Sequence, residues 1–330
     1  MKLAATFSAC WILGPSAGFV DRIRTFHHAD FPVDALVRAK RMLNSTVSVC
    51  IPAHNEETTV GLVVSTVIRH LVLEHPLVDE VVVLDDRSSD RTAAVAAAAG
   101  ATVTAVSDVL PGVLSPPGKG NVLWRSLHAS GSDIVCWVDA DIAGFRAEMV
   151  SGILGPLLTE PYIAFVKGFY ARPTNGNGEG GGRVTELVAK PLIASLFPQL
   201  VGVRQPLAGA TAARREVLES LSFPAGWGVE LALLLDVARS LGVDAIAQAD
   251  LGELRHRTKP LEKLIPQAAA VIDVALARNG NAGEASVRLL GSTGLGSSAG
   301  RMVELPPMER TRSEGGPGDG RPTEAIERPA

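Results

Sequence analysis

The most informative chemical group in the sequence is a pair of aspartates, Asp139 and Asp141, separated by Ala140. They end an apolar run over residues 133–141 that predicts a strand, and ligands of open α/β sheets bind at the carboxyl ends of strands. Two carboxylates at such an edge can meet the phosphates of a nucleoside diphosphate only if a divalent cation lies between them. The pattern therefore predicts either a metal–diphosphate site or a strand-end turn with solvated acids.

Two further polar segments follow apolar runs that predict strands. The segment 52–57, with the sequence PAHNEE, is suited to holding a base and a ribose, although Asn55 is equally suited to capping the next helix. The segment 85–92, with the sequence DDRSSDRT, carries acids suited to hydrogen bonds with a ribose or a uracil edge. Asp90 is equally suited to capping the helix that follows it.

A fourth segment, Gly118-Lys119-Gly120-Asn121, opens a predicted helix. A helix N-terminus with a lysine and flanking glycines suits an anion, although a solvated lysine explains Lys119 as well. The segment is not a P-loop, because the spacing GxxxxGK[ST] is absent. The four segments together fall on one edge of one predicted sheet, which indicates a single site for a nucleotide donor.

Short apolar runs alternate with helical stretches between residues 46 and 168, which predicts a parallel sheet covered by helices on both faces. The predicted fold class is therefore α/β, with a Rossmann-like half for the nucleotide. We expect strands at 46–52, 80–86, 101–106, 133–141 and 163–168, and helices at 56–73, 90–99 and 119–130. After a Gly/Asn-rich loop at 174–182 we expect helices at 184–196, 229–241 and 260–278, and a strand at 243–249.

Composition places limits on the organisation and the partners of the chain. We expect an N-terminal extension over 1–45, a nucleotide-binding half over 46–168, a second half over 169–280 and a disordered tail over 281–330. The net charge of −4 and the 5% aromatic content argue against a nucleic-acid partner. No run of 18 apolar residues predicts a membrane helix, so we expect no membrane partner. Three scattered cysteines are typical of a reducing compartment, so we expect a cytoplasmic location.

Longer stretches of the chain resemble a known family. IPAHNEE, LDDRSSDRT, GKGNVLWRSL and VDAD resemble the motifs of GT-A nucleotide-sugar transferases. GGGRVTELVAKPLIASLFPQL, QPLAG, FPAGWGVELALLLD and DAIAQADLGELRHR resemble those of the actinobacterial glucosyl-3-phosphoglycerate synthases, from about Phe26 to Arg278. The resemblance implies a GT-A fold with a smaller acceptor-binding half. It also implies a metal-dependent, retaining transfer of glucose from UDP-glucose or GDP-glucose to the 2-hydroxyl of 3-phosphoglycerate. Mg²⁺ or Mn²⁺ is then the cofactor, and the protein a homodimer to which the 260–278 helix contributes.

The resemblance also implies roles for individual residues. The donor would be bound by Pro52, Ala53, His54, Asn55, Glu56, Asp86, Lys119, Asp139 and Ala140. The metal would be held by Asp141 and His256, and the acceptor by Gly182, Arg183, Val184 and Thr185. Glu230, at the start of a predicted helix, would face the reacting sugar. Asp141 is catalytic together with Glu230, because the metal that it holds acts as a Lewis acid on the diphosphate.

The chain departs from the family pattern at three places. Ala210-Thr211 stand where the family has an acidic–aromatic pair, Leu254 replaces an arginine, and Thr258 stands where asparagine is common. Another acceptor therefore stays open, such as glycerate, a polysaccharide or a lipid, as does a homologue with a dead site. A nucleotidyltransferase is disfavoured, because PAHNEE stands where such enzymes need a Gly-rich, basic loop for a triphosphate.

Overall fold

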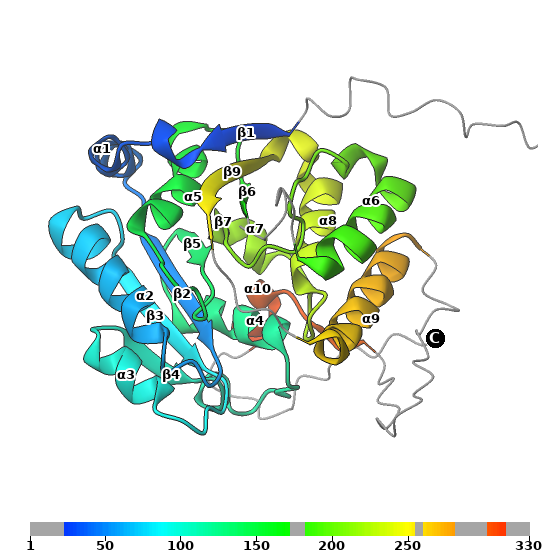
Figure 1. Ribbon diagram of the computed structural model, residues 1–330, viewed down its shortest axis with the longest axis horizontal. Coiled ribbons are helices and arrows are strands. Elements are labelled where there is room, and N and C mark those ends of the chain that lie inside the picture. The colour runs from blue at the N-terminus through cyan, green and yellow to red at the C-terminus, as the bar shows by residue number, and fades with distance from the viewer. Residues whose placement is uncertain (1–22, 172–181, 255–259, 281–301, 315–330) are drawn as a thin grey trace, which may run out of the picture.

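The computed structural model describes residues 23–171, 182–254, 260–280 and 302–314. Eight strands form one mixed sheet in the order β1-β9-β6-β7-β5-β2-β3-β4, and helices cover both of its faces (Figure 1). A second, two-stranded sheet joins β8 and β10. The predicted α/β class is confirmed. The strands are β1 (Arg24–His27), β2 (Val47–Ala53), β3 (Glu80–Asp85), β4 (Thr102–Ala105), β5 (Ile134–Trp137), β6 (Phe165–Ala171), β7 (Thr211–Arg214), β8 (Phe223–Pro224), β9 (Ile246–Glu253) and β10 (Glu304–Leu305).

The helices alternate with the strands through the first half of the chain, as the sequence predicts. The α-helices are α1 (Val33–Leu43), α2 (Val60–Val67), α3 (Thr92–Ala98), α4 (Lys119–Ala129), α5 (Ala147–Thr159), α6 (Lys190–Leu196), α7 (Arg215–Glu219), α8 (Val229–Leu241), α9 (Leu261–Arg278) and α10 (Met308–Glu314). Two π-helical stretches, η3 (Ile68–Glu74) and η5 (Thr185–Ala189), adjoin α2 and α6. Short 3-10 turns are η2 (His28–Asp30), η4 (Val106–Asp108), η6 (Pro198–Leu200) and η7 (Val243–Ala245). None of the helices described has the length and apolar character needed to cross a bilayer.

The two faces of the sheet bury different side chains, because successive residues of a strand point to opposite faces. In β2, Val49 and Ile51 lie in a core formed with α1, α2 and α5. Cys50 lies in a second core, formed with α4 and α8. The continuous apolar runs that predicted the strands therefore serve two cores at once, as expected of a sheet that is covered on both faces.

The pairing of the strands gathers their carboxyl ends at one edge. β5, β2, β3 and β4 are parallel neighbours, so the segments that follow β2, β3 and β5 leave the sheet on the same side. β7 lies between β5 and β6 and is antiparallel to both. β9 pairs in parallel with β6. Since β7 and β9 belong to the predicted second half of the chain, one sheet spans both predicted halves.

Several predicted elements have other bounds in the structure. The strand expected over 133–141 is only the four-residue β5, because the chain leaves the sheet before Asp139. The helix expected over 56–73 begins at Val60 and ends in η3. The helix expected over 184–196 divides into η5 and α6. The helix predicted over 229–241 is α8, with the same bounds.

Residues 24–43 belong to the body of the fold, although the sequence predicted an extension over 1–45. β1 pairs in parallel with β9, from Arg24 opposite Ala247 to His27 opposite Asp250. α1 packs against α5 and buries Leu36 in the first core. β1 is an edge strand with mostly exposed side chains, so it lacks the apolar run by which the other strands were predicted.

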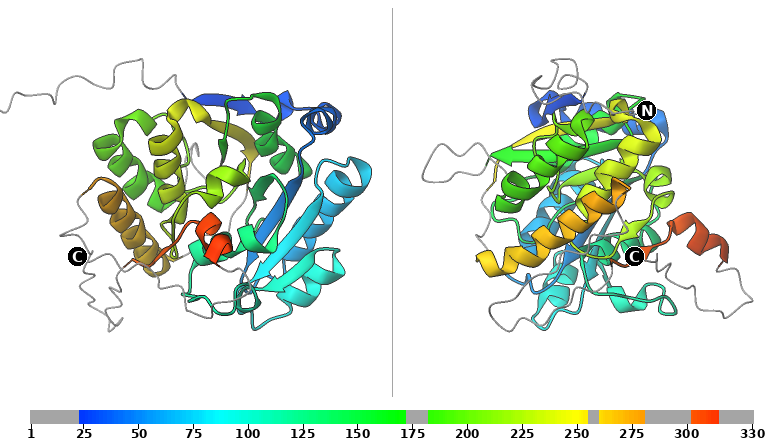
Figure 2. Two further views of the ribbon diagram at one scale, coloured as in Figure 1. Left: turned by 180° about the vertical axis from the view of Figure 1, so that it is seen from behind. Right: turned by 90° about the vertical axis from the view of Figure 1, so that its right-hand side faces the viewer.

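The prediction of disorder over 281–330 is wrong for residues 302–314. β10 pairs with β8, and Leu305 and Met308 are fully buried in the second core. The indole N–H of Trp124 donates to the backbone oxygen of Pro306 at 2.7 Å. Seen from behind, α10 lies against α4 (Figure 2). Leu305 and Met308 are isolated apolar residues in a segment rich in proline and charged residues, so they give no periodic signal. The composition of the segment therefore wrongly indicated disorder.

Candidate active site

The turns after β2 and β3 are joined by hydrogen bonds at the edge of the sheet. We call these residues, 54–57 and 86–92, the turn network. Ala53 and Asp85 are register partners at the ends of the two strands, which places the turns side by side. His54 Nδ1 lies 2.6 Å from the backbone oxygen of Asp86. The structure thus brings together two segments from which the sequence predicted donor-binding residues.

Asn55 connects the two turns in both directions. Its backbone N–H donates to Ser88 Oγ at 3.0 Å, and its Oδ1 accepts from the backbone N–H of Ser89 at 2.8 Å. The next residue, Glu56, donates its N–H to Thr92 Oγ1 at 2.7 Å. Asn55 has a φ of +57°, a left-handed conformation that asparagine tolerates better than most residues. The backbone of this turn is therefore fixed before any ligand binds.

The acids after β3 have separate surroundings. Asp90 accepts hydrogen bonds from the backbone N–H groups of Thr92 at 2.9 Å and Glu57 at 3.2 Å, so it serves the start of α3. Asp85 Oδ1 is buried and has no hydrogen-bond partner among the described residues. An unpaired buried acceptor costs free energy, so Asp85 suits a donor group on a ligand. The sequence analysis assigned Asp86 to donor binding and gave no separate role to Asp85.

A largely buried cation lies between two carboxylates at the start of α4. Lys119 Nζ lies 2.6 Å from Asp139 Oδ1 and 2.9 Å from Glu230 Oε1. Burial on its own lowers the pKa of Lys119, but the charges of Asp139 and Glu230 outweigh burial and raise this pKa above its ordinary value. Lys119 is therefore charged at physiological pH. Three residues predicted from separate segments of the sequence meet here.

Glycines allow these segments to approach each other. The backbone N–H of Gly120 donates to the oxygen of Gly226 at 3.2 Å, and a Cβ at residue 120 would lie 1.9 Å from the oxygen of Pro224. A Cβ at Gly209 would lie 2.1 Å from Asp139 Oδ2. The first contact holds α4 against the segment that leads into α8 and Glu230. The second leaves Asp139 no room to move toward the loop that contains Gly209.

Sequence reasoning missed Lys167, which lies in β6 and is 1% exposed. Its Nζ donates to the backbone oxygen of Ala208 at 2.5 Å and to Thr211 Oγ1 at 3.1 Å. Burial lowers the pKa of Lys167 to about 8, although the negative charge of Glu230 opposes this shift. The available signal was a lysine inside the otherwise apolar run IAFVKG. We call four residues the charged cluster: Lys119, Asp139, Lys167 and Glu230.

Asp141 suits a hard divalent cation. It follows the end of β5, and none of the described residues forms a hydrogen bond or ion pair with its carboxylate. Carboxylate oxygens are favoured ligands of Mg²⁺ and Mn²⁺. Within the described part of the chain, no three His, Cys, Asp or Glu side chains form a ready metal site. Asp141 therefore fits a cation site completed by oxygens of a ligand. The other predicted metal ligand, His256, lies outside the described residues.

The four residues predicted for the acceptor lie at the start of η5. The backbone oxygen of Gly182 accepts from Glu186 at 3.0 Å, Thr185 is buried, and Arg183 is exposed. Two departures from the family pattern, Ala210 and Leu254, are buried in the first core, whereas Thr258 lies outside the described residues.

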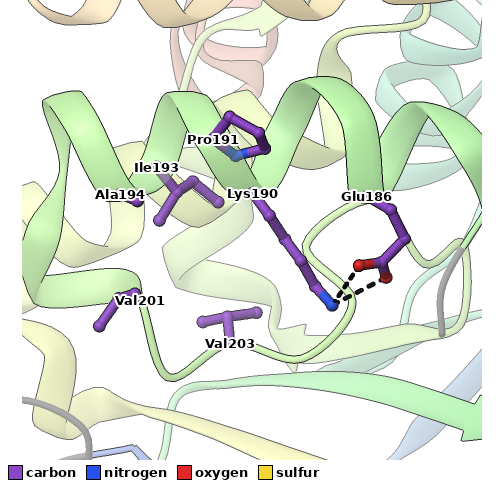
Figure 3. Close-up of a pocket in the computed structure, with 7 residues that line it drawn as sticks. All are labelled: Glu186, Lys190, Pro191, Ile193, Ala194, Val201 and Val203. Carbon is purple, nitrogen blue, oxygen red and sulfur yellow. Dashed lines mark hydrogen bonds and ion pairs between the residues drawn. The ribbon is translucent and has the colours of Figure 1, made fainter. Parts of the chain in front are cut away.

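A pocket of about 310 Å³ opens beside η5 and α6, and no residue of the charged cluster lines it (Figure 3). Its lining is mainly apolar, and the ion pair between Lys190 and Glu186, at 2.7 Å, is its polar part. The lining residues are Glu186, Lys190, Pro191, Ile193, Ala194, Val201 and Val203. None of the residues predicted to bind donor, metal or acceptor lines this pocket.

Comparisons with known proteins agree with this geometry. The model of glycosyl transferase family 2 matches residues 48–220. The glucosyl-3-phosphoglycerate synthase of Petrotoga mobilis is 43% identical over 261 residues, which cover 77% of this chain and 80% of that protein. The enzyme of the same name from Mycolicibacterium smegmatis is 50% identical over 239 residues, 71% of this chain and 78% of its own. The chain belongs to the glucosyl-3-phosphoglycerate synthase family.

Solved structures of the family support the same assignment. The glucosyl-3-phosphoglycerate synthase of Mycobacterium tuberculosis, in complex with Mn²⁺, UDP-glucose and phosphoglyceric acid, superposes with a TM-score of 0.80 at 42% identity. The match covers 88% of this chain and 99% of that one. The mannosyl-3-phosphoglycerate synthase of Rubrobacter xylanophilus superposes with a TM-score of 0.79 at 35% identity, over 89% of this chain and 99% of that one. The predicted family and its GT-A fold are therefore confirmed.

Proposed function

We propose that the protein transfers the glucosyl group of UDP-glucose to the 2-hydroxyl of 3-phosphoglycerate and releases UDP. The observation that carries the proposal is the ion-paired Lys119, which lies between Asp139 and Glu230. Asp139 follows β5, the parallel neighbour of the strand that leads into the turn network. This arrangement joins a site for a nucleoside to a charged site for its diphosphate. The family supports the proposal, because a member binds UDP-glucose and phosphoglyceric acid together with Mn²⁺.

The donor lies across the carboxyl edge of the sheet in this proposal. The turn from Pro52 to Glu56, with Asp86, holds the uridine against a backbone that the turn network has already fixed. Asp139 and Ala140 line the path to the diphosphate. Lys119 stays protonated and places a positive charge where negative charge grows on the leaving diphosphate.

Asp141 and His256 are the residues proposed to hold the divalent cation. When bound, Mg²⁺ or Mn²⁺ supplies Lewis-acid stabilisation of the departing diphosphate. The requirement for such a cofactor is consistent with the Mn²⁺ in the complexes of the Mycobacterium tuberculosis enzyme.

The acceptor is proposed to lie at the start of η5. Arg183 is exposed and able to form charge-assisted hydrogen bonds with the phosphate or carboxylate of 3-phosphoglycerate. Gly182, Val184 and Thr185 shape the backbone around it.

The proposed transfer retains the anomeric configuration. The bond from the anomeric carbon to the diphosphate oxygen breaks, and the acceptor oxygen bonds to the same carbon from the same face. The hydroxyl proton passes to the released diphosphate. No strong base faces this exchange within the charged cluster, since Lys119 is protonated and Glu230 is held in an ion pair. Glu230 instead stabilises positive charge that develops on the sugar.

A product assay tests the proposed function. The protein is incubated with UDP-glucose and Mg²⁺ or Mn²⁺, with and without 3-phosphoglycerate, and UDP and the glucosylated product are measured. We expect UDP release that needs both acceptor and metal, stops with a chelator, and is lost in Asp141→Ala. Parallel reactions with GDP-glucose, GDP-mannose and glycerate identify the preferred donor and acceptor. Release without 3-phosphoglycerate dependence would reject this acceptor, and no release from any nucleotide sugar would reject the transferase.

We further propose a homodimer in the cytoplasm. Leu261 and Ile265 of α9 and Leu187 of η5 are exposed by 59%, 43% and 74%, and a shallow pocket of about 320 Å³ lies beside Ile272. Apolar side chains gathered in this way favour burial against a second copy. Sedimentation velocity of the wild type and of Leu261→Glu tests this, and a monomer in both would reject it. The cytoplasmic location is supported by two buried free thiols, and cell fractionation tests it.

A further inference from the structure

Buried polar side chains stand next to one another on three neighbouring strands of the main sheet, β9, β6 and β7. Thr211 of β7 is the register partner of Lys167 in β6, and Lys167 is the partner of Gln248 in β9. All three are at most 3% exposed. The interior of such a sheet normally carries apolar residues, so this row needs a reason.

The row holds the segment that runs from residue 202 to residue 209. Gln248 donates to the oxygen of Gly202 at 3.0 Å and accepts from the N–H of Arg204 at 2.9 Å. Lys167 donates to the oxygen of Ala208 at 2.5 Å. One end of the segment is therefore fixed by an amide and the other by an ammonium group.

The end of the segment that Lys167 fixes is also the end that lies against Asp139. The residue after Ala208 is Gly209, whose Cα lies so close to Asp139 that a Cβ would meet Oδ2 at 2.1 Å. Asp139 in turn accepts from Lys119. A continuous chain of contacts thus runs from Lys167 through Ala208 and Gly209 to the ion pair at the proposed diphosphate site.

A buried ammonium is an expensive way to hold a carbonyl oxygen, because burial disfavours the charged form. Among the described residues, no carboxylate forms a hydrogen bond or ion pair with Lys167, and both of its acceptors are neutral. Its charge is felt by Glu230 and Asp139 across the site, and Lys119 opposes it. The two lysines and two carboxylates of the charged cluster together have a formal charge of zero.

We propose that Lys167 is a positioning residue for the transfer reaction. Its charged group holds the 202–209 segment against Asp139 and balances the second carboxylate of the charged cluster. The inference rests on the proposed function, and it assigns no contact between Lys167 and the substrates.

Lys167→Met tests the inference, because methionine has nearly the same length and suits a buried position. We expect kcat to fall roughly 30-fold, with the KM for 3-phosphoglycerate changed less than about threefold, since only the ion pair is displaced. The melting temperature should stay equal or rise, because a buried charge is removed. Lys40→Met is the control for activity: Lys40 is also a buried lysine, but it lies on α1 and its Nζ forms an ion pair with Asp79 Oδ2 at 2.6 Å. Its kcat should not change.

A pH profile separates positioning by charge from simple packing. In the wild type, kcat/KM should fall as pH rises through about 8, where Lys167 loses its proton. In Lys167→Met this fall should be absent. A kcat within about threefold of the wild type, or a fall in kcat that tracks a lower melting temperature, would overturn the inference. So would an unchanged pH profile.

The two proposals can fail separately. Wild-type protein without turnover rejects the proposed function, whereas an active wild type with an equally active Lys167→Met rejects only the inference. If the wild type is inactive, the inference is tested by calorimetry of UDP binding in the presence of Mn²⁺. An affinity about tenfold weaker in Lys167→Met than in the wild type supports the inference, and an equal affinity rejects it.

Discussion

The turn network and the charged cluster adjoin the same edge of the sheet, yet they are built differently. The turn network joins two neighbouring turns by hydrogen bonds, most of them to backbone groups, and Asn55 takes part in four of its contacts. The charged cluster brings together four charges from four separate segments, and its two lysines are largely or fully buried. Most polar groups of the turn network find their hydrogen-bond partners in the same turn or in the adjacent one. In the charged cluster, Lys119, Asp139 and Glu230 each depend on an opposite charge from another segment.

This difference predicts unequal sensitivity to substitution. Loss of one neutral hydrogen bond costs about 1 kcal/mol, because water or a neighbour replaces part of it. Loss of one partner from a buried ion pair costs about 3–5 kcal/mol, because the other charge stays buried without compensation. Substitution of Lys119, Asp139 or Glu230 should therefore reduce both activity and stability, whereas substitutions in the turn network should mainly weaken donor binding.

The largest effect is expected for Lys119→Met. It leaves Asp139 and Glu230 facing each other without the cation between them, so kcat should fall roughly 10²–10³-fold and the free energy of unfolding by about 3–5 kcal/mol. Turnover assays and urea denaturation measure the two effects. The double variant Lys119→Met/Glu230→Gln should recover stability but not activity. A single variant that is stable and active would remove the distinction between the two regions.

An intermediate effect is expected for Gly209→Ala. The added Cβ meets Asp139 Oδ2 and displaces this carboxylate from Lys119, so kcat/KM should fall roughly 10²-fold while the core stays intact. Gly112→Ala is the control, because nothing lies within 4 Å of a Cβ at that residue. Kinetics and thermal melts of both variants test the expectation. Wild-type kinetics in Gly209→Ala would show that the position of Asp139 is not fixed by this loop.

The smallest effect is expected for Asn55→Ala in the turn network. The variant loses the contact with Ser89 and strains a left-handed residue, so the KM for UDP-glucose should rise roughly three- to tenfold and stability should fall by about 1 kcal/mol. Asn44→Ala is matched, because Asn44 has a φ of 49° at the end of α1, remote from this edge. Its stability should fall similarly with no change in KM. A larger loss of kcat than in Gly209→Ala would reverse the order proposed here.

The same contrast explains how much of the site could be predicted from sequence. The turn network is formed by segments that each follow an apolar strand, so position relative to the strand indicated a ligand site before the structure was known. Lys119 could also be singled out from its position, because it opens a predicted helix. The pairing of Lys119 with both Asp139 and Glu230 could not be predicted, because it depends on how α8 packs against α4. The residue roles themselves stay predictions until the variants are measured.

The features that escaped prediction share one cause. Lys167 is a single polar residue in an apolar strand, and its partners are a backbone oxygen and a hydroxyl group from another part of the chain. β10 has two residues and is stabilised by tertiary contacts alone. Periodicity reports the side chains that one segment buries by itself, so it cannot report contacts that exist only after distant segments have met.

The neighbour relation of β1 and β9 has a consequence for synthesis on the ribosome. The partner of Arg24–His27 emerges about 220 residues after β1 itself. At roughly 5–20 residues per second, β1 waits on the order of 10–40 s for β9, its neighbour in the sheet. An unpaired strand invites association with other nascent chains, and short strands with charged side chains resist it. The four residues of β1 include Arg24 and are mostly exposed, so the feature that hid this strand from prediction also protects the unfinished chain.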